Sequence, residues 1–129
     1  MKSLLLAILF LTAAAHAHHG SADYHVDREI TVTGVVKEWR WTNPHTWVYV
    51  TAVKADGAAG GNSEEWKGEG PPLNWAAQRG WSSATLRVGE AISLVMYPSR
   101  RAARAGLVKR IDRPRREPLL VSRPWLDGG

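Results

Sequence analysis

The sequence predicts a mainly β protein: a small five-stranded, OB-like Greek-key barrel with one short helix between the third and fourth strands. Two observations predict this fold class. Short apolar segments rich in β-branched and aromatic residues recur over residues 30–111, each bounded by glycine, proline or asparagine. One helical segment interrupts them after the third strand, and this order of elements is that of an OB-fold. An open five-stranded sandwich is the alternative.

The first two strands are expected at residues 30–41 and 46–53. In the first strand the apolar period changes at Gly34, which predicts a bulge or sharp coil. Asn43-Pro44 then imposes a turn, because proline cannot donate a hydrogen bond and restricts the residue before it. The second strand carries apolar residues on both faces, which indicates a central, well-covered strand.

The third strand is predicted to be weak and to centre on Trp66, and its acidic residues indicate an edge or a solvent-facing position. Pro71-Pro72 opens a helix that ends at Gly80, and Trp81 is expected to pack beneath it. The remaining elements are the helix itself at residues 73–79, a fourth strand from Gly89 with Ile92, Leu94 and Met96 facing inward, and a fifth strand at residues 105–111.

The amino-terminal segment has the pattern of a secretory signal peptide. Lys2 precedes an apolar run over residues 4–15, and Ala15-His16-Ala17 matches the small-x-small cleavage pattern. A run of about 12 apolar residues is too short to span a hydrocarbon core of about 30 Å. We therefore predict a signal peptide at residues 1–17, cleavage after Ala17 or alternatively after Ala15, and a periplasmic or secreted protein.

The positive charge of the chain is concentrated at its carboxyl-terminal end. The formal net charge is +5, yet residues 18–99 carry 7 Lys and Arg against 9 Asp and Glu, and residues 100–129 carry 9 against 3. Export disfavours nucleic acid as a partner, so an anionic envelope lipid or a partner protein is the expected ligand of this end. The Arg- and Pro-rich residues 113–129 are predicted to form a disordered tail after a barrel domain at residues 30–112.

The histidines are the candidate metal ligands. Cleavage after Ala17 would make His18 the amino terminus, so its amine and imidazole, with His19 and a remote imidazole, could bind Cu(II) in a nitrogen-rich plane. His45 is the expected remote ligand, because Asn43-Pro44 fixes its backbone at a strand entrance. The alternative is a structural His45 whose ring bonds a backbone carbonyl in the turn. The chain has no cysteine, which excludes disulfides and thiolate ligands.

Seven tryptophans supply either core or a binding surface. Most must fill the barrel, and Trp47 and Trp66 are the candidates for a surface groove. Catalytic arrangements are absent: the serines lack a nucleophile-elbow context, and Glu64 and Glu65 are adjacent on a strand and so point to opposite faces. We therefore expect a binding module and no enzyme, with no certain cofactor and Cu(II) as the candidate. A module that binds a glycan or a partner protein through an aromatic groove is the alternative.

The chain also resembles a family of short exported bacterial proteins catalogued as domain of unknown function 6152. The shared features are the His18-His19 pair, a block with the pattern Trp41-Thr42-Asn43-Pro44-His45-x-Trp47, the Arg79-Gly80-Trp81 motif and Gly89-Glu90. The resemblance covers residues 18–111 and implies an OB-like barrel and an envelope location, but no reaction. Two features depart from the family pattern: Gly20-Ser21 after the histidine pair, and the Arg-rich extension after Ile111.

Overall fold

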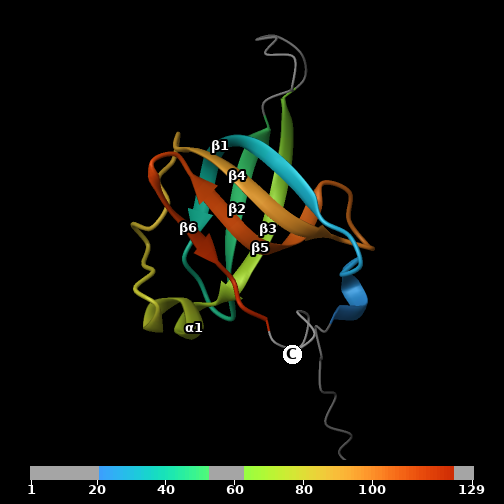
Figure 1. Cartoon of the computed structure of the whole chain (residues 1–129), viewed down its shortest axis with the longest axis horizontal. Coiled ribbons are helices and arrows are strands. Elements are labelled where there is room, and N and C mark those ends of the chain that lie inside the picture. Colours follow the sequence, from blue (N-terminus) through green and yellow to red (C-terminus); the bar gives the residue numbers. More distant parts are fainter. Residues whose placement is uncertain (1–20, 53–62, 124–129) are drawn as a thin grey trace, which may run out of the picture.

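The computed structural model describes residues 21–52 and 63–123, and it is built almost entirely of strands (Figure 1). Its elements in chain order are η1 (Ser21–Asp23), β1 (Ile30–Arg40), β2 (His45–Ala52), β3 (Glu64–Pro72), α1 (Leu73–Gln78), β4 (Ala91–Pro98), β5 (Ala105–Arg113) and β6 (Arg116–Leu120). The predicted signal peptide, His18 and His19 lie outside the described residues. No helix in the described ranges is long and apolar enough to cross a membrane.

Five of the strands close into a barrel. The sheet runs β3-β2-β1-β4-β5-β6, and a parallel pairing of β3 with β5 closes the first five of these strands into a ring, with β6 outside it. Gly68 and Gly106 face each other in that pairing, and a Cβ on Gly68 would lie 2.7 Å from the Val108 side chain. Glycines therefore let β3 and β5 approach closely enough to close the sheet. The closure confirms the predicted barrel and excludes the open sandwich.

The long first strand takes part in both halves of the barrel. Residues Ile30 to Val35 pair with β4, and residues Gly34 to Arg40 pair with β2. A Cβ at Gly34 would lie 2.1 Å from the backbone oxygen of Thr51, so this position requires glycine for close approach. The sequence predicted a bulge at Gly34, but the bulge lies between Val36 and Glu38. The inward face therefore continues to Val36, and Val35 is exposed.

The barrel interior is filled by the inward faces of the strands. The residues with the least exposure include Val48 and Val50 of β2, Leu94 and Met96 of β4, and Val108 and Ile111 of β5. β2 is a central strand, as predicted, because β1 and β3 flank it; one of its faces is buried, and the other, with Trp47 and Tyr49, is partly buried.

α1 lies at one end of the barrel (Figure 1), and a cluster of tryptophans packs there. Trp81 is buried, and its ring centroid lies 6.1 Å from that of Trp75 and 6.4 Å from that of Trp39. Trp39 also donates from its indole nitrogen to the Ser82 carbonyl at 2.9 Å. The helix and the position of Trp81 under it are as predicted.

Two predictions about strands are wrong. β3 is no edge strand, because β2 and β5 flank it, and its Glu69 is only 9 % exposed. The chain after Arg113 is not disordered throughout, because β6 pairs with β5 on the outside of the barrel. Leu119 and Val121 are buried against the core. An edge strand tolerates proline, so the composition of this segment was compatible with a strand after all.

Candidate functional site

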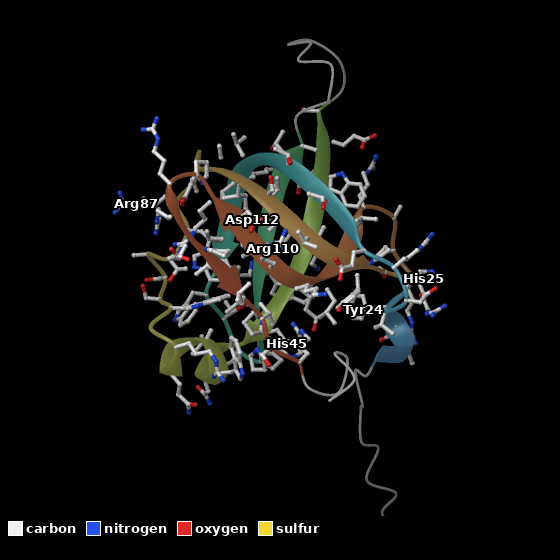
Figure 2. All side chains as sticks on the ribbon, viewed as in Figure 1. Tyr24, His25, His45, Arg87, Arg110 and Asp112 are labelled. Atoms are coloured by element: carbon white, nitrogen blue, oxygen red, sulfur yellow. The ribbon has the colours of Figure 1, made fainter. Side chains whose placement is uncertain are left out.

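A buried carboxylate on β3 gathers two polar side chains from distant parts of the chain. The Nδ1 atom of His45 lies 2.7 Å from Oε1 of Glu69, and the Tyr24 hydroxyl donates a hydrogen bond to Oε2. The side chain of Glu69 is 11 % exposed and that of His45 is 25 % exposed. Figure 2 shows Tyr24 and His45 near the same end of the barrel. We call these three residues the Glu69 cluster.

Local strand geometry places His45 beside Glu69. The pairing of β2 with β3 sets Glu69 opposite Trp47, and a register shift between His45 and Trp47 lets the imidazole reach the carboxylate. On the other side of β2, the buried hydroxyl of Thr46 donates to the Pro71 carbonyl at 3.0 Å. The first residues of β2 are thus held by contacts on both faces of the sheet.

The backbone of Tyr24 is held by the residues that follow β4. It forms an isolated bridge with Ser99, and Nε of Arg100 donates to the Tyr24 carbonyl at 3.0 Å. The neighbouring Asp23 forms an ion pair with Arg101 at 2.8 Å. These contacts anchor the segment that leads into the barrel, so Tyr24 reaches Glu69 from a fixed backbone.

The electrostatics of the cluster set its proton positions. Burial raises the pKa of Tyr24, and the hydrogen bond to Glu69 raises it further, against a lowering effect of the nearby Arg123 charge. The phenol therefore stays protonated and donates. The contact of Nδ1 with the Glu69 carboxylate leaves Nε2 as the ring nitrogen of His45 that is directed away from this carboxylate.

An imidazole oriented by a carboxylate suits two kinds of chemistry. It can ligate a metal through Nε2, with the carboxylate fixing the tautomer, or it can accept a proton. Within residues 21–52 and 63–123, no group of three or more His, Cys, Asp and Glu side chains could hold a metal ion. His45 therefore needs ligands from outside these ranges to form a metal site.

The structure places the other predicted site residues apart. Trp47 lies on the outer face of β2, with the Lys67 ammonium 4.0 Å from its ring centroid. Trp66 pairs with Val50, on the inner face, and packs against the core. Because paired residues share a face, Trp47 and Trp66 lie on opposite sides of the sheet and do not form one groove. His45, for which the sequence left a metal ligand and a structural turn residue as the two interpretations, has its Nδ1 in contact with Glu69.

Comparison with known families identifies where this arrangement belongs. The model of a family of unknown function, DUF6152, matches residues 7–109. The chain belongs to this family. His45 of the Glu69 cluster and Trp81 of the tryptophan cluster both lie within the matched residues. No curated protein and no solved structure matches the chain.

Sequence reasoning missed Tyr24 and Glu69 as members of this site. A signal for Glu69 was present, because it is the single charged residue in the run Gly68-Glu69-Gly70-Pro71-Pro72. Glycine at 70 is required there, since a Cβ would lie 2.2 Å from the Thr46 hydroxyl. Nothing in the sequence pairs Tyr24 with a residue 45 positions away.

Proposed function

We propose that this DUF6152 protein is a periplasmic or secreted binding module, without enzymatic activity, that binds Cu(II). The ligands are the amine and imidazole of a processed amino-terminal His18, the imidazole of His19, and Nε2 of His45. The observation that carries the proposal is the 2.7 Å contact between Nδ1 of His45 and buried Glu69. It orients a partly exposed imidazole and leaves its second nitrogen available, as in carboxylate–histidine metal sites.

The path of the chain supports the proposal. Tyr24 contacts the same carboxylate as His45, and His19 precedes Tyr24 by five residues. Five residues span at most about 17 Å when fully extended. The terminal histidines are thus within reach of His45 without any change in the barrel.

The donor set favours copper among the transition metals. It consists of nitrogens, with no cysteine in the chain to recruit softer thiolate chemistry. An amine and an imidazole on one residue form a chelate ring, and planar nitrogen coordination suits Cu(II). Since ligand nitrogens must be deprotonated, affinity should fall as the pH drops below about 6.

The test is a Cu(II) titration of the mature protein, followed by electron paramagnetic resonance and calorimetry. His45→Ala should remove one nitrogen ligand, and Glu69→Gln should weaken Cu(II) binding by about 10–100-fold. His25→Ala is the matched control, since the His25 side chain is 29 % exposed and its Nδ1 lies 4.0 Å from the Asp27 carboxylate. It should leave the spectrum unchanged.

Two outcomes would contradict the copper proposal. One is an identical copper spectrum for the mature protein and for a form that begins at Asp23 and so lacks His18 and His19. The other is a loss of thermal stability in His45→Ala with unchanged copper affinity, which would make His45 a structural residue. Either result would favour the alternative below.

The alternative is a module that binds a glycan or a partner protein through the outer face of β2 and β3. The observation in its favour is a row of half-exposed aromatic rings and cations. Lys67 lies over Trp47 and 5.8 Å from the Tyr49 ring centroid, and Arg40 lies 5.0 Å from that same centroid. Because Lys67 already covers Trp47, a sugar would have to displace it to stack there.

A further inference from the structure

A polar hollow, separate from the Glu69 cluster, lies between the segment after α1 and the hairpin of β5 and β6. It has a volume of about 410 Å³, and its lining includes three arginines, Arg79, Arg113 and Arg116. Trp81, Ser82 and Thr85 form its opposite wall. The Glu69 cluster contributes no residue to it. We call this hollow the arginine pocket.

The arginine pocket carries an excess of positive charge. The carboxylate near it is Glu90, whose Oε1 lies 2.9 Å from Nη1 of Arg116. The other oxygen of Glu90 accepts a hydrogen bond from the backbone nitrogen of Arg87. The adjacent acidic residue on β5, Asp112, is paired with Arg110 instead, at 2.8 Å. Among the described residues, the lining of the pocket therefore contains three guanidinium groups and no carboxylate, and Glu90 pairs with one of the three.

Arg113 is the least compensated of these groups. Its Nη2 donates to the Glu117 carbonyl at 2.6 Å, but its buried Nε has no hydrogen-bond partner among the described residues. Burial lowers the pKa of Arg113, and the like charge of Arg116 lowers it further, against the opposing effect of Glu90. A bound anion would offset this unfavourable placement of charge.

The opposite wall offers neutral donors. The Ser82 hydroxyl oxygen accepts from the Ala84 nitrogen at 3.1 Å, and the Thr85 hydroxyl oxygen accepts from the Ser82 nitrogen at 2.7 Å. Each hydroxyl accepts in these bonds, so each retains its hydrogen to donate. Arg79 is fixed at the rim, with its guanidinium 3.6 Å from the Trp75 ring centroid. Guanidinium groups and hydroxyl donors thus line the same pocket.

We infer that the arginine pocket binds a phosphate group, either inorganic phosphate or the phosphomonoester of a larger molecule. Arginine forks match the oxygens of phosphate in pairs, and hydrogen bonds between charged partners are the stronger kind. Arg79 lies inside the region matched by DUF6152, whereas Arg113 and Arg116 lie beyond residue 109. The pocket therefore gives the basic carboxyl-terminal segment a specific role, independent of copper binding.

The experiment is a titration of the full mature protein with inorganic phosphate at pH 7.5 and constant ionic strength, read by calorimetry and by amide NMR shifts. We expect saturable binding, with the largest shifts at residues 79–85 and 113–119. Arg113→Gln and Arg116→Gln should each weaken phosphate binding about tenfold or more, the effect expected for a charged hydrogen bond. Arg79→Gln, at the exposed rim, provides a third variant if either of these fails to fold.

Arg87→Gln is the matched control. It removes the same charge from the same segment, but Arg87 is exposed, does not line the pocket and lies at the outer edge of the molecule (Figure 2). Its phosphate affinity should equal that of the unmodified protein. Equal losses in Arg87→Gln and Arg116→Gln would show only general charge attraction and overturn the inference. So would a titration with no binding beyond that of chloride.

A vesicle arm distinguishes the two sources of phosphate. Vesicles of phosphatidylcholine with 20 % phosphatidic acid present a phosphomonoester, whereas those with phosphatidylglycerol present only a diester. Cosedimentation with phosphatidic acid alone, displaced by inorganic phosphate and lost in Arg116→Gln, assigns the pocket to a lipid headgroup. Phosphate binding without cosedimentation assigns it to a soluble phosphate. Cosedimentation that Arg113→Gln and Arg116→Gln leave intact, without phosphate binding, would contradict the pocket.

Discussion

At the scale of single residues, the Glu69 cluster shows how one buried carboxylate organises donors from three segments. Glu69 accepts a hydrogen bond from Tyr24 and lies 2.7 Å from Nδ1 of His45, and the charge of Arg123 acts on Tyr24. A buried carboxylate costs free energy unless such donors surround it. Such a carboxylate can hold an imidazole in one orientation, and the proposed copper site requires an imidazole oriented in this way.

The protonation of Tyr24 gives a prediction about alkaline pH. Its pKa in the folded protein is above the unfolded value of about 10, so the folded state keeps a proton that the unfolded state releases. The stabilisation is complete below pH 10 and is lost as the pH rises further. Tyr24→Phe should therefore be less stable than the unmodified protein at pH 8, and the difference in unfolding free energy should narrow between pH 10 and pH 11. Urea titrations of both proteins measure it; a constant difference would refute the assignment.

At the scale of elements, β6 changes the meaning of the carboxyl-terminal segment. Its composition is basic and proline-containing, yet the strand presents Leu119 to the core, followed by the buried Val121. The same strand brings Arg116 to the arginine pocket. A single edge strand thus joins core packing to the proposed phosphate site.

Adjacent leucines on β6 test its packing. Leu119 is 8 % exposed and Leu120 is 61 % exposed, so the two differ in environment while sharing one strand. Leu119→Ala should lower the unfolding free energy by about 2–4 kcal/mol, because it removes a buried side chain and leaves a cavity. Leu120→Ala should change it by less than about 0.5 kcal/mol. Denaturant unfolding measures both changes. Equally small changes for the two variants would contradict the packing of β6 against the core.

The elements also show what the sequence could predict. Alternating apolar positions at Ile92, Leu94 and Met96 specified a strand with one inward face, and Pro72 with Gly80 bracketed the helix. The period of apolar residues within a segment depends on that segment alone, and so does the formation of these two elements. As a signal it failed at β6, where Arg116 and Pro118 precede the adjacent leucines and hid the pairing, and at the bulge of β1, which is set by the partner strand.

The candidate site was predictable only in part, for a related reason. His45 could be singled out because the Asn43-Pro44 turn is visible in the sequence. Glu69 and Tyr24 could not be joined to it, because their meeting depends on the register between β2 and β3 and on the bridge between Tyr24 and Ser99. Such contacts follow from barrel closure, which no single segment encodes.

At the scale of the whole molecule, the two proposed sites draw on different ends of the chain. The copper site depends on residues before Ser21, and the arginine pocket depends on residues after Ile111. The barrel holds the residues proposed to act with each end: His45 with Glu69 for the first, and the Arg79–Thr85 segment for the second. Loss of one site should therefore leave the other intact.

Export and processing are the last prediction, because the copper site requires a free His18 amine. Lys2, the apolar run at residues 4–15 and Ala15-His16-Ala17 together predict cleavage after Ala17. Intact mass of the protein from the periplasmic fraction should correspond to a chain beginning at His18. Replacing both Ala15 and Ala17 by Arg should block cleavage, retain Met1 and remove the chelate-ring copper spectrum, since His18 would then carry an amide in place of its amine. A soluble cytoplasmic protein that retains Met1 would contradict both the location and the metal site.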